Sequence, residues 1–186
     1  MPLGAKICGL SESDQIQACV NCGASMCGYI LFYPKSHRNL NLDKAKELTS
    51  LKHSKSNVAV MVNPNNADLE SIKDFNFHYY QIYGNQKPDE INDIKQKYKV
   101  KIIKALTVET KEDVLKYKIY EEVSDIILFD SKGYEQSLSF PHSLLDDVSK
   151  SVKKMIAGNI QIQELEKISK IADILDISGA VETKKK

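Results

Sequence analysis

Short apolar runs alternate along this chain with longer segments whose apolar residues recur at helical spacing. The runs are rich in β-branched and aromatic residues, which favour strands, and several of the longer segments begin with Asp, Asn, Ser or Thr, which favour helix starts. The strands are predicted to end near Cys8, Phe32, Val62, Ile82, Leu106, Phe129, Ile156 and Ile177. The helices are predicted to cover about 13–22, 43–52, 66–75, 88–98, 111–120, 143–150 and 161–170.

This order of elements predicts an α/β fold with a parallel sheet. Strands that are each followed by a helix, without hairpin signals, close naturally into a (β/α)8 TIM barrel when there are eight of them. A doubly wound open sheet is the alternative, because the count depends on short strands. Only Ser178 to Lys186 follow the eighth strand, so the final helix is expected to be missing or truncated. We expect residues 1–186 to form a single barrel domain.

The charge balance narrows the possible partners. The 26 Lys and Arg residues nearly cancel the 25 Asp and Glu residues, so we expect neither a nucleic-acid partner nor a membrane surface. No apolar run approaches the roughly 18 residues that a membrane span needs. All four cysteines lie within the first 27 residues of a chain that is too large to need disulfides, which favours a cytoplasmic protein with reduced thiols.

The first predicted strand ends in a thiol, in the run Lys6-Ile7-Cys8-Gly9-Leu10. Alternate residues of a strand share a face, so Lys6 and Cys8 point one way and Ile7 points the other. If Ile7 packs under a helix, Cys8 faces the barrel interior at the end of the strand where barrel enzymes keep their chemistry. A buried structural cysteine is the other interpretation.

A metal or redox site is a rival hypothesis, because Cys19 and Cys22 form a C-x-x-C pair near Cys27. A zinc site needs about four ligands, and no second such pair follows. Cys19 and Cys22 also lie three apart on the first predicted helix, so an apolar helix face explains them. We therefore predict no metal site; the histidines are scattered singly, at His37, His53, His78 and His142.

Eight short motifs occur in order at the predicted strand ends. They are KICGL at 6–10, GYILFYPKSHR at 28–38, VNP at 62–64, YQIYG at 80–84, IKA at 103–105, LFD at 128–130, AGN at 157–159 and DISGAVE at 176–182. Taken in this order, they resemble the phosphoribosylanthranilate isomerase family over essentially the whole chain. The resemblance implies a cofactor-free Amadori rearrangement of a phosphorylated aminosugar, N-(5-phosphoribosyl)anthranilate, to 1-(2-carboxyphenylamino)-1-deoxyribulose 5-phosphate in tryptophan biosynthesis. We expect a monomer or a homodimer.

The same resemblance implies the catalytic roles. Cys8 corresponds to the general base and Asp130 to the general acid. A base must be a thiolate, so we expect Lys6 to lower the pKa of Cys8. An acid must keep its proton, and burial beside Leu128 and Phe129 favours that for Asp130. Without the resemblance, Asp130 could equally be a helix cap at a strand end.

Further residues correspond to the substrate site. Arg38 matches the arginine that grips the anthranilate carboxylate, although a surface arginine is the plain alternative. Asp176 either orients the ligand or is a buried hydrogen-bond partner, and Gln81 lines the pocket or packs in the core. The phosphate is expected at the turns after strands seven and eight, on the backbone of Gly158 and Asn159, and of Ser178, Gly179 and Ala180.

Three departures from the family pattern bear on catalysis. Tyr83 stands where the family usually has His; a phenol donates a hydrogen bond but does not exchange protons near pH 7. The family's glycine-rich run after strand six is absent. Lys132 is a candidate to replace the positive charge that is lost with that run. Ala180 replaces a glycine. The alternative function is therefore a catalytically impaired barrel that binds a sugar phosphate; a related histidine-pathway isomerase ranks lower, since that family has an aspartate at the position of Cys8.

Overall fold

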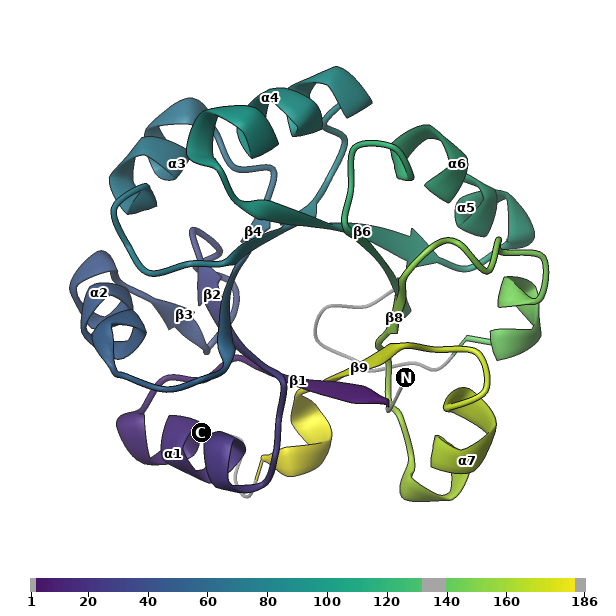
Figure 1. Ribbon diagram of the computed structural model, residues 1–186, viewed down its shortest axis with the longest axis horizontal. Helices are drawn as coiled ribbons and strands as arrows, with labels where there is room; N and C mark the ends of the chain where they lie inside the picture. The colour runs from purple at the N-terminus through teal and green to yellow at the C-terminus, as the bar shows by residue number, and fades with distance from the viewer. Residues whose placement is uncertain (1–2, 132–139, 183–186) are drawn as a thin grey trace.

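The computed structural model describes residues 3–131 and 140–182, and in it the strands form a closed ring with helices on the outside (Figure 1). All neighbouring strands are parallel, and β1 pairs with both β9 and β2, which closes the barrel. The open-sheet alternative is therefore wrong. In ring order the strands are β1 (Gly4–Cys8), β2 (Met26–Leu31), β4 (Ser56–Val62), β5 (Tyr79–Tyr83), β6 (Lys101–Val108), β7 (Ile126–Ser131), β8 (Lys154–Ile156) and β9 (Ile174–Ile177).

A further strand, β3 (Asn39–Leu40), pairs with the end of β2 outside this ring. Two residues are too short to show an alternating pattern, so no periodicity predicts this strand.

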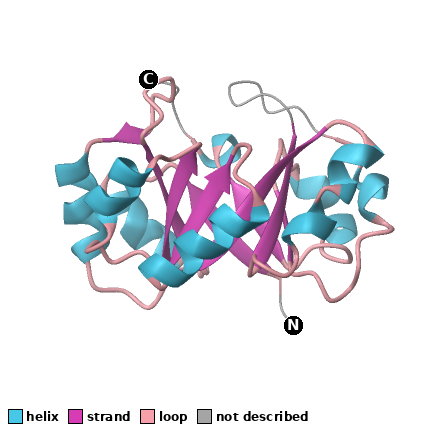
Figure 2. Ribbon diagram, turned by 90° about the horizontal axis from the view of Figure 1, so that it is seen from above, coloured by secondary structure: helices cyan, strands magenta, loops and turns pink. Residues whose placement is uncertain are grey.

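The helices surround the strand wall, as the side view shows (Figure 2). None of the described helices is long and apolar enough to span a membrane. The α-helices are α1 (Ser13–Asn21), α2 (Leu42–Ser50), α3 (Asn66–Ile72), α4 (Pro88–Tyr98), α5 (Lys111–Leu115), α6 (Tyr117–Tyr120) and α7 (Leu165–Ile168). The 3₁₀ helices are η1 (His142–Leu145), η2 (Ile162–Glu164) and η3 (Gly179–Val181).

The helix prediction is wrong in the last third of the chain. The helix expected over 143–150 is only the single 3₁₀ turn η1, because Ser149 accepts a hydrogen bond from the backbone of Ser151 and so competes with helix formation. The helix expected over 161–170 divides into η2 and α7. After β9, the described residues contain only η3, in keeping with the expected lack of a full final helix.

The alternation along each strand separates two apolar layers. One lies between strands and helices and includes Ile7, Leu48 and Phe129; the other fills the barrel and includes Leu128, with Cys8 packed against it. The predicted orientation of Ile7 outward and Cys8 inward is thus confirmed.

A buried ion pair joins the two strands at which the chain closes the ring. Lys6 on β1 and Asp176 on β9 are register partners, and the Lys6 Nζ atom lies 2.8 Å from both carboxylate oxygens. Lys6 is fully buried and Asp176 is 8% exposed. Gly28 makes room for the lysine, since a Cβ there would lie 2.9 Å from Lys6 Cε. Within the described part of the chain, each of the two is the other's ion-pair partner, so the loss of either one leaves a buried charge without its counterion.

Replacing Lys6 with Met should destabilise the fold by about 3–5 kcal/mol, because the Asp176 carboxylate is then buried without a partner. Urea unfolding followed by circular dichroism measures the free energy. The double variant Lys6→Met/Asp176→Leu removes both charges and should recover much of the loss. A single variant within about 1 kcal/mol of the parent would show that the pair is not a structural constraint.

Candidate active site

Four of the residues singled out from the sequence come together at the carboxyl ends of the strands. Cys8 is the last residue of β1, and Tyr83 is the last residue of β5. Asp130 lies one residue before the end of β7, and Asp176 lies one residue before the end of β9. In a barrel these ends share one face of the molecule, which is where barrel enzymes hold their chemistry. The charges of Asp176 and Cys8 both influence Tyr83, and that of Asp176 also influences Asp130, so the four form one electrostatic unit.

The Cys8 thiol is held in its neutral form in the ligand-free protein. Burial raises its pKa to about 11, and the negative charge of Asp176 acts in the same direction. Lys6 acts in the opposite direction, but its ammonium group is already paired with Asp176. Lys6 thus lowers the pKa of Cys8 as expected, but burial outweighs this effect and the net pKa lies above the ordinary value.

Asp130 retains a proton to higher pH than an ordinary aspartate. Burial raises its pKa to about 6, and the hydrogen bond from Tyr83 acts against that rise. Tyr83 Oη donates to Asp130 Oδ2 over 2.8 Å. When Asp130 is protonated, this bond engages Oδ2 as an acceptor and leaves Oδ1 to carry the proton. Tyr83, the residue that departs from the family pattern, thus orients the candidate acid.

Gln81 lies in the same interior layer as Tyr83, two residues before it on β5. It is fully buried, and its Nε2 atom lies 3.3 Å from Tyr83 Oη. Its Oε1 atom has no hydrogen-bond partner among the described residues. A buried acceptor without a donor is costly, so Gln81 fits a group that meets a ligand better than a group that only fills the core.

Arg38 reaches this face from the segment between β2 and β3. Its guanidinium makes two hydrogen bonds of 2.7 Å to the carboxylate of Glu182, which directly follows η3. Glu182 is the last residue of the motif at 176–182, and the sequence alone indicates no role for it. A partner 144 residues away has no local signal, so only the fold reveals this pair.

The two turns predicted to hold phosphate follow β8 and β9 directly. Gly158 and Asn159 have positive φ angles of 100° and 39°, which turns the chain sharply there. Gly179 and Ala180 form the start of η3, with Ser178 before it. All of them lie at the same end of the barrel as Cys8. Lys132, proposed to replace a lost positive charge, lies outside the described residues.

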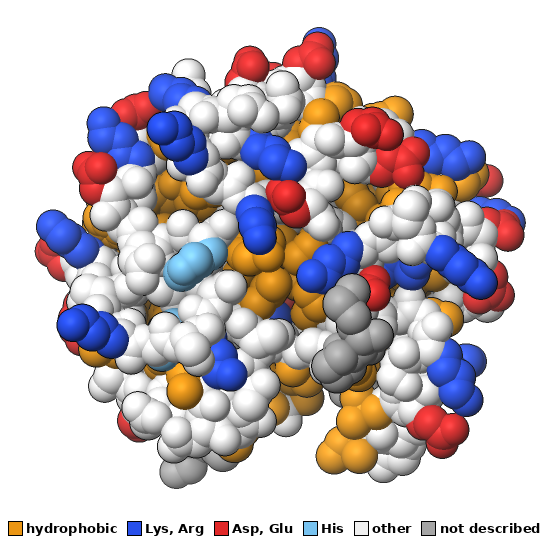
Figure 3. Space-filling model, in the orientation of Figure 1, with side chains coloured by type: hydrophobic (Ala, Val, Ile, Leu, Met, Phe, Trp, Pro, Cys, Tyr) orange, Lys and Arg blue, Asp and Glu red, His pale blue; other side chains and the backbone are white. Residues whose placement is uncertain are grey.

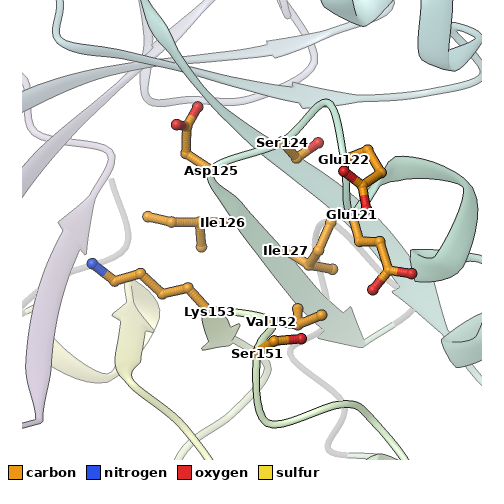
Figure 4. Close-up of a pocket in the computed structure, with 9 residues that line it drawn as sticks. All are labelled: Glu121, Glu122, Ser124, Asp125, Ile126, Ile127, Ser151, Val152 and Lys153. Carbon is orange, nitrogen blue, oxygen red and sulfur yellow. The ribbon is translucent and has the colours of Figure 1, made fainter.

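Two further features of the described surface lie apart from this group of residues or show no clustering of charge. Figure 3 shows Lys, Arg, Asp and Glu side chains intermixed around one face, without a large area of one sign. A groove with a volume of about 260 Å³ is lined by residues that include Asp125, Ile126 and Lys153. Figure 4 shows these side chains at the start of β7 and just before β8. These residues begin β7 or precede β8, so the groove lies at the opposite end of the strands from Cys8.

The cysteines do not form a metal cluster. Cys19 is buried on α1, whereas Cys22 is exposed and lies just past the end of that helix, so the predicted shared apolar face does not include Cys22. Between residues 3 and 131 and between 140 and 182, no three His, Cys, Asp or Glu side chains are grouped so as to hold a metal ion.

The fold and the site define a class: a parallel (β/α)8-barrel enzyme with a thiol and a carboxylic acid at the carboxyl ends of its strands. Residues 5–185 match the family model described as N-(5'phosphoribosyl)anthranilate (PRA) isomerase. The chain is 30% identical over 193 residues to the N-(5'-phosphoribosyl)anthranilate isomerase of Rhodopseudomonas palustris, covering 98% of this chain and 88% of that protein.

Solved structures agree on the fold. Phosphoribosyl anthranilate isomerase from Thermotoga maritima superposes with a TM-score of 0.88 at 24% identity, covering 98% of this chain and 91% of that one. Another structure of the enzyme, in complex with reduced 1-(o-carboxyphenylamino)-1-deoxyribulose 5-phosphate, has a TM-score of 0.85 at 22% identity, with 98% and 90% coverage. The chain belongs to the N-(5'-phosphoribosyl)anthranilate isomerase family, and the predicted family, barrel fold and isomerase class are confirmed.

Replacing Tyr83 with Phe should raise the pKa of Asp130 above about 6, because the phenol hydroxyl stabilises the carboxylate. The other groups that act on Asp130 stay in place: Asp176 raises its pKa, while Lys6 and the backbone bond at Ser131 lower it. Titration of the ¹³C-labelled aspartate carboxyls by NMR measures the shift.

The matched control is Tyr79→Phe, which removes a hydroxyl from the same face of β5 at its other end. It should leave the pKa of Asp130 unchanged. An Asp130 pKa that is equal in Tyr83→Phe and in the parent would contradict the role given to the Tyr83 hydroxyl.

Proposed function

We propose that this chain catalyses the Amadori rearrangement of N-(5-phosphoribosyl)anthranilate to 1-(2-carboxyphenylamino)-1-deoxyribulose 5-phosphate, a step of tryptophan biosynthesis, with Asp130 as general acid and Cys8 as general base. The observation that carries the proposal is the pairing of a proton-retaining carboxyl with a thiol at the carboxyl ends of a family barrel. Their pKa values, about 6 and about 11, are set apart by the environments that the fold gives them.

The first step is opening of the ribose ring. Asp130 gives its proton to the ring oxygen, the bond between that oxygen and C1′ breaks, and the lone pair of the anilino nitrogen forms a C1′=N⁺ iminium. Tyr83 supports this step by engaging Oδ2 of Asp130, so that the proton sits on Oδ1. General acid catalysis of this kind typically contributes 10²–10⁴-fold.

The second step removes the proton from C2′. Cys8 accepts it as a thiolate, and the electrons of the C2′–H bond form a C1′=C2′ double bond while the nitrogen becomes neutral. The resulting enol then gains a proton at C1′ and loses the proton of its 2′-hydroxyl, whose oxygen becomes the carbonyl of the ketose.

The thiolate has to be formed in the substrate complex, because the ligand-free thiol has a pKa of about 11. The iminium is a new positive charge beside Cys8, and a nearby cation favours the thiolate. The site thereby activates its base only when the ring has opened.

Two anchors hold the substrate at its ends. Arg38 offers a planar fork of N–H groups to the anthranilate carboxylate. The turns at 158–159 and 178–180 offer backbone N–H groups to the phosphate. The named ligand of one solved relative, reduced 1-(o-carboxyphenylamino)-1-deoxyribulose 5-phosphate, carries both of these groups.

We also propose that the chain acts in the cytoplasm as a monomer or homodimer. A Thermotoga maritima relative is described as dimeric.

Cys8→Ala and Asp130→Asn should each lower kcat by at least about 10²-fold while the fold is retained, because each removes one proton-transfer group. The loss of phosphoribosylanthranilate fluorescence on adding enzyme measures turnover, and circular dichroism checks the fold. Cys22→Ser is the matched control, since that thiol is exposed and lies beyond α1. Near-parent turnover in either active-site variant would overturn the assigned role. A folded parent that binds substrate without turnover would favour the impaired barrel.

Arg38→Ala should raise KM by roughly 10–100-fold with a smaller effect on kcat, because hydrogen bonds to a charged group contribute about 1.5–3 kcal/mol. Steady-state kinetics over a range of substrate concentrations separate the two constants. An unchanged KM would rule out Arg38 as the carboxylate anchor.

A further inference from the structure

The pair formed by Arg38 and Glu182 is held tightly although it lies near the surface. Arg38 Nε is 2.7 Å from Glu182 Oε1, and Arg38 Nη2 is 2.7 Å from Glu182 Oε2. The two side chains are 19% and 25% exposed. Arg38 lowers the pKa of Glu182 to about 2, and His37, at 3.1 Å from Oε1, acts in the same direction. The glutamate is therefore an anion throughout the neutral range.

This pair uses only one edge of the guanidinium. A guanidinium carries five N–H groups in one plane, and a carboxylate can bind it in two-point fashion at either of two edges. Glu182 occupies the edge formed by Nε and Nη2. The other edge, formed by Nη1 and the second Nη2 hydrogen, suits a second planar carboxylate. Among the described residues no acceptor is bound to Nη1.

The stem of Arg38 is fixed as well as its head. A Cβ on Gly9 would lie 2.3 Å from Arg38 Cδ, and the backbone φ of Gly9 is +84°, a value that residues with a side chain rarely adopt. The arginine therefore lies across the turn that directly follows Cys8, and its positive charge reaches the thiol. The aliphatic part of Arg38 packs over Gly9, and its guanidinium is paired with Glu182. Together these contacts give the guanidinium one orientation at the mouth of the barrel.

We propose that Glu182 is a positioning residue for substrate recognition: it holds one edge of Arg38 so that the other edge binds the carboxylate of the aromatic ring. This inference rests on the proposed function of Arg38. It links the segment after β9 to the segment after β2, so that these two distant parts of the chain build a single carboxylate site. Without Glu182, the substrate has to order a free arginine side chain by itself, which costs affinity.

Simple charge repulsion makes the opposite prediction. Glu182 and the substrate carboxylate are both anions beside one cation, so removal of the glutamate charge alone would tighten binding. The substitution Glu182→Gln keeps the shape but loses the two-point pairing, since an amide offers one acceptor and one donor. The sign of the change in affinity therefore distinguishes positioning from repulsion.

The test compares two stable ligands on the full chain by isothermal titration calorimetry. One is reduced 1-(2-carboxyphenylamino)-1-deoxyribulose 5-phosphate, and the other is the same molecule without the ring carboxylate. Glu182→Gln should weaken binding of the first by about tenfold or more, the loss of one good charge-assisted interaction, and change the second less than about twofold. In kinetics KM should rise while kcat stays within about threefold.

Two controls keep the result specific. Glu109→Gln removes a negative charge at the same end of the barrel, just after β6, and should leave both affinities unchanged. Glu182→Asp keeps the charge and the two acceptors and should retain part of the affinity that Glu182→Gln loses.

Equal or tighter binding of the carboxylated ligand by Glu182→Gln would overturn the proposal, as would an equal loss for both ligands. A parent that does not prefer the carboxylated ligand would instead contradict the role of Arg38 and, with it, the proposed function.

Discussion

The buried pair between Lys6 and Asp176 is the interaction on which the rest of the site depends. It joins β1 to β9, the strands whose pairing closes the barrel, and it lies next to the candidate site. Because both charges are almost completely enclosed, their fields act strongly on their neighbours. Asp176 raises the pKa of Cys8, Tyr83 and Asp130, while Lys6 lowers that of Cys8 and Asp130. Burial is the largest cause of the raised pKa of each of these three groups, and the ion pair adds to or opposes it. The pair thus helps to close the fold and modulates the protonation of the groups near it.

The barrel itself follows from local patterns in the sequence. β1 and β4 end at Cys8 and Val62 as predicted, because alternation and β-branched composition act over a few residues. α4 spans 88–98 as predicted, with a proline in its first turn and acids beside it. After Ser131 the strands still end at Ile156 and Ile177 as predicted, but the helices predicted over 143–150 and 161–170 shorten to single turns. Helical periodicity is weak evidence for segments of this length.

The candidate site was only partly predictable. The inward direction of Cys8 follows from alternation, and the resemblance of the strand ends supplied Asp130 and Arg38. The hydrogen-bond partners of these residues are determined by the closed barrel and not by residues nearby in the sequence. Nothing near Arg38 in the sequence points to Glu182. Nothing near Asp130 indicates that Tyr83, on the far side of β6, donates a hydrogen bond to it. The net rise of the Cys8 pKa could not be predicted either, because it comes mainly from burial within the closed barrel, which outweighs the effect of Lys6.

A crystal structure of the chain with reduced 1-(2-carboxyphenylamino)-1-deoxyribulose 5-phosphate tests the account most directly. The account predicts that Cys8 Sγ and an Asp130 carboxyl oxygen contact the ligand from different sides, the thiol at C2′ and the acid near the former ring oxygen. It also predicts that the carboxylate lies on Arg38 and the phosphate at the turns 158–159 and 178–180. A ligand bound with C2′ out of reach of Cys8, or with its carboxylate away from Arg38, would contradict the account.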